Sequence, residues 1–584
     1  MKRASVIALL LFPLLLQGQV LLRIPADRLD APVLLGSRIV DVSQSWGKVF
    51  APGQRNPFPQ LMHFCLDSAG RVALVPEELR SLREEGRGRG RGKRLEHVHP
   101  LHFPVVERAA DGSLTLDAGE YLSSYPLSVS AIPPKMLEKE VQLSGEFLSV
   151  SETPEYLQVT AKYTYASGLE VTAAVYFLFL PRDPMPGKRV TGYNSAQQRG
   201  HRRDAPSQRW DLSRRDSIVF YVDKAFPKAW FPYIKEGVED WNRAFEAAGM
   251  GKVLSALPEP DGLDRHSPLV NMVRYMDVEE ANAKGDVLCD PRSGEILQGD
   301  ILWWKNVVSL NMLWRYAQTG VADPAARQPE YTLEVLGPMI RYAVCHEMGH
   351  VLGLGHNMGA SWAYPTDSLR SPSFTRKYGT TASVMDYARY NHLATAADVQ
   401  AGVNLLPPRL GPYDYYAIAC GYGAGVPEPG EYCYYAPPLS AAISPDPSAQ
   451  AETLGNDLLA SSAAGLRNCC ALMELDGLDN ERLKFLKKQY YRYIWLSLSN
   501  FGGSVQGVPV PWEIYEKTFS FVQKGLLEVP AALKDRKQEQ RILEELCGNF
   551  LPERVYRTLG EKAFRRYEKK VNKLKKKYNQ TVEL

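Results

Sequence analysis

The feature that most constrains this chain is one short run of residues, His346-Glu347-Met348-Gly349-His350-Val351-Leu352-Gly353-Leu354-Gly355-His356. Apolar residues recur at helical spacing before and within it, so the sequence predicts a helix over residues 331–354. His346 and His350 then lie one turn apart on the same face of that helix. Gly353 lets the backbone leave the helix with a positive φ, so the chain can turn and bring His356 back to the same place.

Three histidines placed in this way predict a metal site. Two imidazoles one turn apart can both reach one ion at a Zn–N distance of roughly 2.0–2.1 Å, and three neutral ligands leave one tetrahedral position for water. We therefore expect His346, His350 and His356 to bind one catalytic Zn²⁺. Glu347 would take a proton from the zinc-bound water and pass it to the leaving amine. The predicted chemistry is hydrolysis of an amide.

The run resembles the HExxHxxGxxH signature of the metzincin metallopeptidases, which also carry a tight turn with a methionine beneath the zinc. Residues 383–387, Ser-Val-Met-Asp-Tyr, resemble that Met-turn. More narrowly, the segment from Phe220 through Trp241 to Arg389 is similar to the bacterial exported Met-zincin family. The resemblance implies a zinc peptidase that acts on proteins or peptides. It also implies a metzincin-like catalytic domain, in which a twisted mixed sheet carries a zinc helix.

The resemblance also implies roles for residues around the histidines. Met385 would form a hydrophobic floor under the imidazoles. Tyr387 matches a tyrosine that in some metzincins binds zinc or stabilises the tetrahedral oxyanion, a task that suits a phenol beside a Lewis acid. A buried structural tyrosine is the alternative. The strand expected at Ile296–Trp304 would form the sheet edge that pairs with an extended substrate. Residues 357–381, nearly structureless by pattern, would form one wall of the cleft.

At 584 residues the chain is too long for a single core. Residues 19–181 contain runs rich in Val, Tyr, Thr and Phe, which predict a β-rich N-terminal domain. Residues 182–216 lack periodicity and predict a linker to the metzincin-like domain, expected over residues 217–425. Residues 426–584 predict an α-helical C-terminal region. The predicted fold class is therefore α+β multidomain, with the catalytic domain in the middle.

The first residues predict export. Lys2 and Arg3 precede an apolar run from Val6 to Leu16, so residues 1–18 are expected to be a signal peptide; an uncleaved anchor is the alternative. We therefore expect a periplasmic or extracellular protein. No other stretch approaches about 18 uninterrupted apolar residues, so no integral membrane segment is expected after signal removal.

Charge and cysteine content add two further expectations. Lys plus Arg number 69 against 66 Asp plus Glu, so nothing points to a nucleic-acid partner. Eight cysteines in an exported chain allow disulfides, and Cys420 with Cys433 is the best candidate pair. Cys65 lacks the proline and glycine setting of the matrixin cysteine switch. Whether the N-terminal domain is an inhibitory pro-segment or a permanent partner therefore stays open.

Together these features predict an exported zinc-dependent endopeptidase with Glu347 and Tyr387 as catalytic residues and zinc as the cofactor. Two alternatives from other classes stay open. One is a zinc-containing binding or scaffold protein of the cell envelope, whose cleft would be too occluded for a peptide. The other is a hydrolase of a non-peptide amide, such as a cell-wall cross-link.

Overall fold

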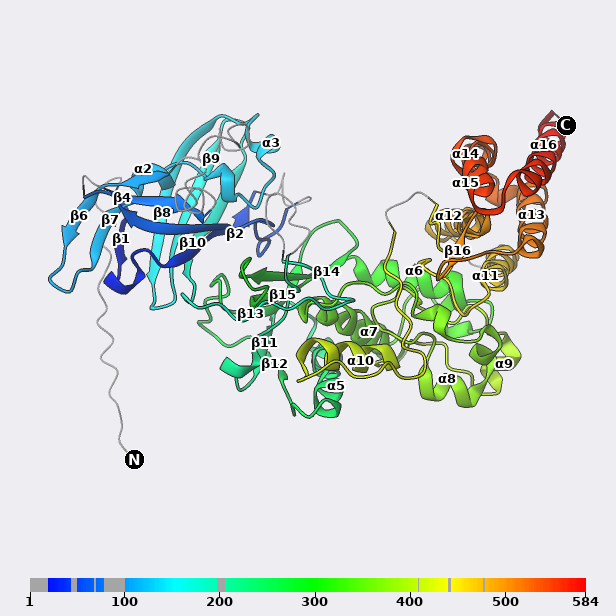
Figure 1. Ribbon diagram of the computed structural model, residues 1–584, viewed down its shortest axis with the longest axis horizontal. Helices are drawn as coiled ribbons and strands as arrows, with labels where there is room; N and C mark the ends of the chain where they lie inside the picture. Colours follow the sequence, from blue (N-terminus) through cyan, green and yellow to red (C-terminus); the bar gives the residue numbers. More distant parts are fainter. Residues whose placement is uncertain are drawn as a thin grey trace.

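The chain is a mixed α+β protein, as predicted. In the computed structural model, strands gather at one end, helices gather at the other, and a second sheet with its own helices lies between them (Figure 1). The predicted signal peptide, residues 1–18, lies outside the part that the structure describes. The described residues are 19–43, 50–67, 70–77, 100–196, 205–407, 409–439, 443–475 and 478–583.

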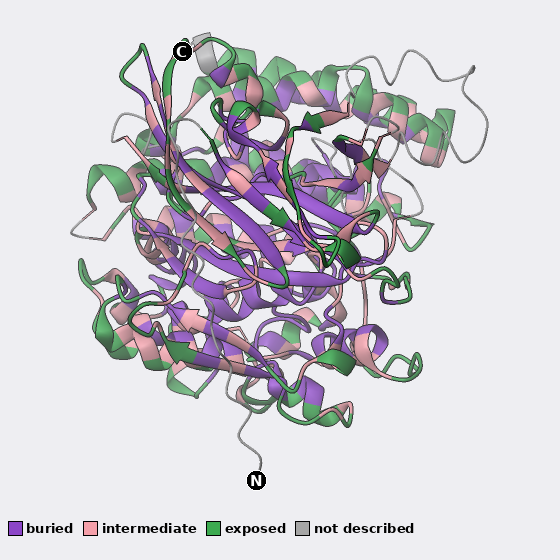
Figure 2. Cartoon of the chain, turned by 90° about the vertical axis from the view of Figure 1, so that its left-hand side faces the viewer, coloured by how far each residue is buried: buried purple, intermediate pink, exposed green. Residues whose placement is uncertain are grey.

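The N-terminal strands form a seven-stranded sheet in the order β5-β4-β3-β2-β10-β9-β8 and a three-stranded sheet in the order β1-β7-β6. The turn between β9 and β10 uses Gly168 at φ 85°, a conformation that glycine adopts without strain. β10 is buried along nearly its whole length, and Figure 2 shows this burial over the central strands. Two short helices accompany the sheets. The bounds are β1 Leu21–Ile24, β2 Pro32–Val42, β3 Gln60–Leu66, β4 Val72–Pro76, β5 Leu101–Phe103, β6 Val105–Arg108, β7 Leu114–Asp117, α2 Gly119–Leu122, α3 Pro134–Leu137, β8 Gln142–Glu152, β9 Tyr156–Tyr165 and β10 Glu170–Phe179.

The next strands form a five-stranded sheet in the order β12-β11-β13-β15-β14. Four of them run parallel to one another, and β14 is antiparallel to β15. The sheet is therefore mixed, with its single antiparallel strand at one edge. The bounds are β11 Ile218–Val222, β12 Leu254–Pro258, β13 Asn271–Met276, β14 Ala283–Cys289 and β15 Ile296–Trp304.

The prediction that Ile296–Trp304 forms the sheet edge is wrong, because β14 pairs outside it and is itself the edge. Every residue of β15 is buried, as expected for an apolar strand covered on both faces. Trp303 and Trp304 are both buried, so neither faces a cleft. β14 has the sequence AKGDVLC, and its Lys, Gly and Asp have low β propensity, which is why the pattern did not predict a strand there.

Helices α4 and α7 pack on one face of this sheet. Residues 357–381, expected to lack structure, contain α8 and two short 3-10 helices. Ser371 begins α8 by accepting a hydrogen bond from the N–H of Phe374 at 3.4 Å, and Pro372 occupies the first turn. The bounds of the helices in this part are α4 Phe231–Glu239, α5 Asn242–Ala247, α6 Val307–Thr319, α7 Leu333–Val351, α8 Pro372–Tyr378, α9 Ala396–Gln400 and α10 Pro412–Tyr422.

The N-terminal domain packs on the other face of the five-stranded sheet at β14 and β15. Tyr176 of β10 packs in one buried cluster with Leu288 of β14 and Leu297 of β15. Ala51, which follows β2 in the chain, packs with Leu302 of β15. The strands β14 and β15 therefore lie between the N-terminal sheet on one side and α7 on the other.

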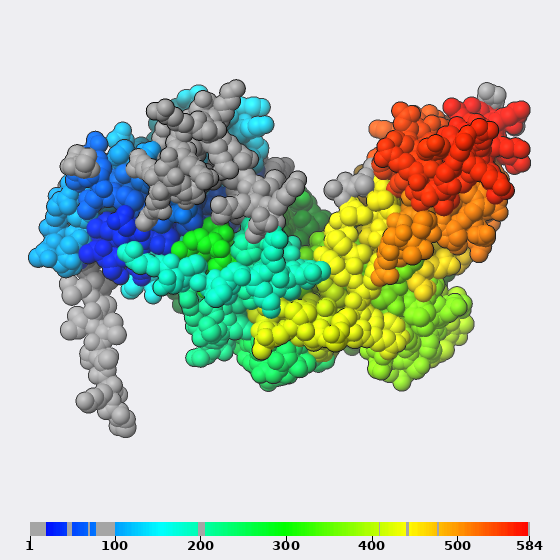
Figure 3. All heavy atoms as spheres, viewed as in Figure 1, coloured from blue at the N-terminus to red at the C-terminus, as the bar shows by residue number. Residues whose placement is uncertain are grey.

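The described parts of the predicted linker, residues 182–196 and 205–216, run across the surface of the central part (turquoise in Figure 3). Trp210 in this segment is buried, and its Nε1–H donates to the carbonyl of Val351 at 2.9 Å. The segment thus packs on the end of α7 as well as connecting two sheets.

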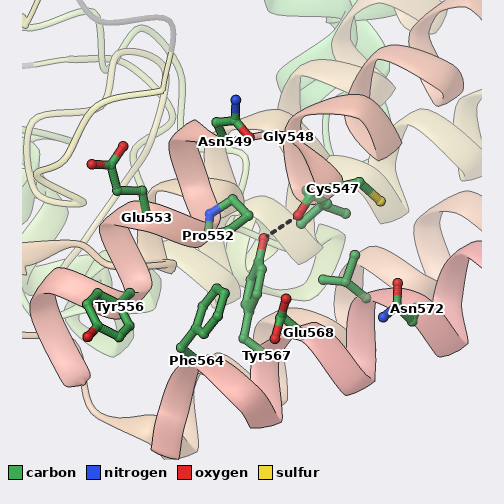
Figure 4. A pocket seen from close by; sticks show the side chains of 12 residues that line it. Cys547, Gly548, Asn549, Pro552, Glu553, Tyr556, Phe564, Tyr567, Glu568 and Asn572 are labelled. Atoms are coloured by element: carbon green, nitrogen blue, oxygen red, sulfur yellow. Dashed lines mark hydrogen bonds between the residues drawn. The ribbon is translucent and has the colours of Figure 1, made fainter. Parts of the chain in front are cut away.

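The C-terminal residues form a helical region around one large apolar core. The sequence pattern in this part is compatible with one continuous helix. The structure instead has two helices, α15 and α16, which are separated at Gly560 with φ 79°. A pocket of about 600 Å³ lies between α14, α15 and α16 (Figure 4), at the end of the molecule away from α7 (Figure 1). The bounds are α11 Leu458–Leu472, α12 Asn480–Ser497, β16 Ser504–Val505, β17 Val508–Pro509, α13 Trp512–Leu527, α14 Arg536–Cys547, α15 Phe550–Leu559 and α16 Glu561–Glu583.

The structure also answers two expectations about the whole chain. Among the residues it describes, no helix is long and apolar enough to span a bilayer. Cys420 and Cys433 are not joined to each other, so the predicted Cys420–Cys433 disulfide is not formed. Instead, Cys420 is buried, and the Cys433 Sγ lies 3.7 Å from the carbonyl oxygen of Pro412.

Candidate metal centre

Helix α7 carries two of the three histidines and the glutamate. Val344, Met348 and Val351 are fully buried in the core that α7 shares with α4 and the five-stranded sheet, which fixes the rotation of the helix about its own axis. The helix ends at Val351, and Gly353 follows with φ 92°. A Cβ at position 353 would collide with the carbonyl oxygen of Gln208, so both the conformation and the space require glycine.

The structure brings the three predicted ligands together. The Nε2 atom of His356 lies 3.3 Å from that of His346 and 3.2 Å from that of His350. For a tetrahedral zinc ion with Zn–N bonds of about 2.0–2.1 Å, neighbouring nitrogens should be roughly 3.3–3.4 Å apart. The spacing of the three rings therefore fits a zinc ion.

Two backbone carbonyls orient these rings. The Nδ1 atom of His346 lies 2.7 Å from the carbonyl oxygen of Val384, and that of His350 lies 2.8 Å from the carbonyl oxygen of Leu354. If each Nδ1–H donates to its carbonyl, the Nε2 lone pairs are left for the metal.

The electrostatic surroundings keep the imidazoles neutral, which is the form that ligates metal. Burial lowers the pKa of His346 well below its ordinary value, and the neighbouring histidines add to this. Burial also lowers the pKa of His350, and it lowers that of His356 to about 3. The three histidines can therefore bind a metal ion without first losing protons at neutral pH.

The residues that resemble a Met-turn lie against the zinc helix. Met385 is fully buried, and a Cβ at Gly349 of α7 would collide with its Sδ. Val384 in the same turn holds His346, as described above. The turn thus supports the histidines from below, in the position that the resemblance implies for Met385.

Asp414, in the first turn of helix α10, holds the turn at residues 383–387 in place. This role of Asp414 was not identified from the sequence. Its carboxylate accepts hydrogen bonds from the Ser383 hydroxyl at 2.6 Å, the Val384 N–H at 2.8 Å and the Gly411 N–H at 2.7 Å. The only sequence signal was local: an Asp three residues after Gly411 is typical of a helix N-terminus. Burial raises the pKa of Asp414 to about 6.

Replacing Asp414 with alanine is expected to destabilise the protein by on the order of 3 kcal/mol, because three donors lose their shared acceptor. Zinc affinity should also fall, by roughly 10- to 100-fold, because Val384 no longer holds the His346 ring firmly. Thermal unfolding and a competitive zinc titration measure the two effects. Asp367→Ala, at an exposed carboxylate in the same part of the chain, is the matched control. Wild-type zinc affinity in Asp414→Ala would contradict the supporting role.

Glu347 lies on α7 beside the histidines, and its Oε2 accepts a hydrogen bond from the Gly285 N–H of β14 at 2.7 Å. Burial raises the pKa of Glu347 to about 7. A dication at the histidines would favour the carboxylate and lower that value. Gly285 was not identified from the sequence. A Cβ there would meet the Glu347 carbonyl oxygen at 2.5 Å and the Cβ of His350 at 2.7 Å, so β14 lies directly against the zinc helix.

Tyr387 is half-buried next to the histidines. Its ring centre lies 4.7 Å from that of His356 and 5.4 Å from that of His346. The guanidinium of Arg389 lies over the Tyr387 ring at 4.8 Å and is itself held by Glu452 at 3.0 Å. The Tyr387 ring therefore lies beside the rings of His346 and His356.

Comparison with known proteins agrees with this geometry. Residues 328–431 match a family model described as Met-zincin, and this segment contains all three histidines, Glu347 and Tyr387. No curated protein and no solved structure matches the chain. Residues 328–431 are therefore a segment of the metzincin type, with a triad of histidines that could hold a metal ion.

Proposed function

We propose that this protein is an exported zinc-dependent endopeptidase. The observation that carries the proposal is the convergence of three imidazole nitrogens at 3.2 and 3.3 Å, with the Glu347 carboxylate on the same helix. The match of residues 328–431 to the Met-zincin family supports the same chemistry. The charged and then apolar composition of residues 1–18 supports export to the periplasm or the medium.

The residues around the site have separate tasks in this proposal. A zinc ion held by the three histidines would supply a Lewis acid that polarises the scissile carbonyl and acidifies water in the site. Glu347 takes the proton from the attacking water and delivers it to the leaving nitrogen. The Gly285 N–H holds Oε2 of Glu347, so Oε1 is left for the proton transfers. The hydroxyl of Tyr387 donates to the developing oxyanion.

An extended substrate would bind along β14, which is the edge of the sheet. In an antiparallel pair, alternate residues direct their backbone groups toward the neighbouring strand. The Gly285 N–H donates to Glu347 and not to β15, so the outward-facing groups belong to Ala283, Gly285 and Val287. A peptide that pairs with these groups would pass beside Glu347 and the histidines.

Removal of zinc is the first test. The purified protein is expected to contain about one zinc ion per chain and to cleave members of a peptide library. Treatment with a zinc chelator should abolish cleavage, and stoichiometric Zn²⁺ should restore it. Ca²⁺ or Mg²⁺ should not restore it, because these ions prefer oxygen ligands. Cleavage that persists in metal-free protein would contradict the proposal.

Other outcomes of the same test separate the alternative functions. Bound zinc without cleavage of any peptide would favour a binding or scaffold protein of the cell envelope. Degradation of purified cell-wall material without peptide cleavage would favour a hydrolase of a non-peptide amide.

A further inference from the structure

A buried network of charged side chains joins the N-terminal domain to the five-stranded sheet. Arg38 of β2 donates to Asp300 of β15 at 2.9 Å and to Gln298 at 3.2 Å. Arg55 donates to Gln298 at 2.7 Å and, from Nη2 and Nε, to Asp286 of the edge strand β14 at 2.7 and 3.1 Å. The side chains of Arg38 and Asp300 are 0% exposed, and that of Arg55 is 3% exposed. The Arg38–Asp300 contact is therefore fully enclosed, and the Arg55–Asp286 contact is largely enclosed, with the Asp286 side chain 19% exposed.

Arg274 of β13 completes the network from the five-stranded sheet, with its Nε 3.0 Å from Asp300. Its side chain also packs under Gly53 of the N-terminal domain, where a Cβ would meet its Cδ at 2.8 Å. Buried charges are tolerated only when each has partners, because desolvation is expensive and an orphan charge is strongly destabilising. Separating the two sheets would break these pairs and would expose the apolar side chains of Leu288, Leu297 and Leu302.

The edge strand β14 links this network to Glu347 through two adjacent residues. The Asp286 side chain points toward the N-terminal domain and receives Arg55. The neighbouring Gly285 faces α7, and its N–H donates to Glu347 Oε2 at 2.7 Å. Successive residues of a strand face opposite sides of the sheet. The contact of Asp286 with Arg55 on one side therefore fixes the position of the β14 backbone, and this backbone contacts Glu347 on the other side.

We propose that Arg55 and Asp286 are positioning residues through which the N-terminal domain holds the edge strand β14, and with it Glu347, in the working arrangement. The N-terminal domain is then a permanent part of the catalytic unit and not an inhibitory pro-segment. Its contacts lie on the face of the sheet opposite to α7, behind the strand along which a substrate would bind. This inference rests on the proposed peptidase function.

Replacement of the ion pair by apolar residues of similar size tests the positioning role. In Arg55→Met/Asp286→Leu no buried charge of the pair is left alone, so the fold is expected to persist. Hydrogen exchange of the β14 amides, residues 283–289, should become at least about tenfold faster in both metal-free and zinc-loaded full-length protein, because the strand loses its clamp. The kcat for peptide hydrolysis should fall by about tenfold or more with a smaller change in KM, at unchanged zinc content.

Two further variants keep this test decisive. Arg55→Lys retains the charge but makes fewer hydrogen bonds, so its exchange rates and kcat should lie between those of the wild type and the double variant. Arg23→Gln/Asp111→Asn removes an exposed ion pair of the same domain and should behave as wild type. Unchanged β14 exchange together with wild-type kcat in Arg55→Met/Asp286→Leu would overturn the inference. If the wild type itself cleaves no peptide, the proposed function fails, while the exchange measurement still decides whether Arg55 holds β14.

Cutting the chain between the N-terminal domain and the rest of the protein tests whether this domain is a permanent part of the catalytic unit. A recognition sequence for a specific protease replaces residues 197–204 of the full-length protein, which is then cut there. The two pieces are expected to elute together in gel filtration and to keep the activity of the uncut protein. Separation of the pieces accompanied by a rise in peptidase activity would identify a pro-segment and overturn the inference.

Discussion

Replacing Glu347 with glutamine is expected to slow peptide hydrolysis by about 1,000-fold and to leave zinc binding unchanged. Glutamine has the same length and keeps an oxygen that can accept the Gly285 N–H, a hydrogen bond of 2.7 Å in the wild type. It cannot take up a proton at neutral pH, so both proton transfers lose their carrier. The measurements are kcat with fluorogenic peptides and zinc content per chain.

Glu334→Gln is the matched control for this variant, because Glu334 lies in the first turn of the same helix and is exposed. It should retain wild-type kcat and zinc content. A Glu347→Gln protein that cleaves peptides within about tenfold of the wild-type rate would show that another group carries the proton, which contradicts the mechanism. Loss of zinc from Glu347→Gln would instead show that the carboxylate helps to build the metal site.

Replacing His356 with alanine is expected to weaken zinc binding by at least about 100-fold. Structural zinc sites gain about 10–16 kcal/mol from four ligands, or roughly 3 kcal/mol for each, and each 1.4 kcal/mol is about tenfold in affinity. His356 lies after the end of α7, so its removal should leave the helix and the other two histidines in place. Peptidase activity should disappear when zinc is limiting.

A competition assay with a zinc-binding dye measures this affinity. His102→Ala is the matched control, because His102 is an exposed histidine on β5, outside the triad. Excess zinc should restore part of the metal content of His356→Ala. Zinc affinity equal to that of the wild type would show that His356 is not a ligand, even though its Nε2 lies 3.2 Å from that of His350.

The cluster of His346, His350 and His356 could be predicted because its geometry is local. His346 and His350 are one helical turn apart in any α-helix, and a positive φ at Gly353 returns the chain within a few residues. The structure places the His356 Nε2 at 3.3 Å from that of His346 and 3.2 Å from that of His350, close to the spacing around a tetrahedral zinc ion. Tyr387 was placed by resemblance, and it lies beside the histidine rings. The prediction for the histidines needed no contact between distant segments of the chain. The prediction for Tyr387 did, and it came from the family resemblance.

The supporting residues could not be predicted, because each acts across a long stretch of sequence. Asp414 orients the turn at Val384 from the start of another helix, and Gly285 contacts Glu347 from 62 positions away. Lys284, Gly285 and Asp286 in the first half of β14 have low β propensity, so the sequence pattern predicts no strand there, and the resemblance assigns the edge to β15.

The sequence by itself thus predicted that His346, His350 and His356 come together and that the fold is of the α+β class, because helical spacing, glycine conformation and apolar periodicity are properties of short segments. Only the tertiary structure decided which strand forms the sheet edge and which domain stands behind it. The identity of the edge strand depends on which strands pair, and the packing of the N-terminal domain behind it depends on the contact of Arg55 with Asp286. These interactions stabilise the protein only after distant segments of the chain have come together and excluded water.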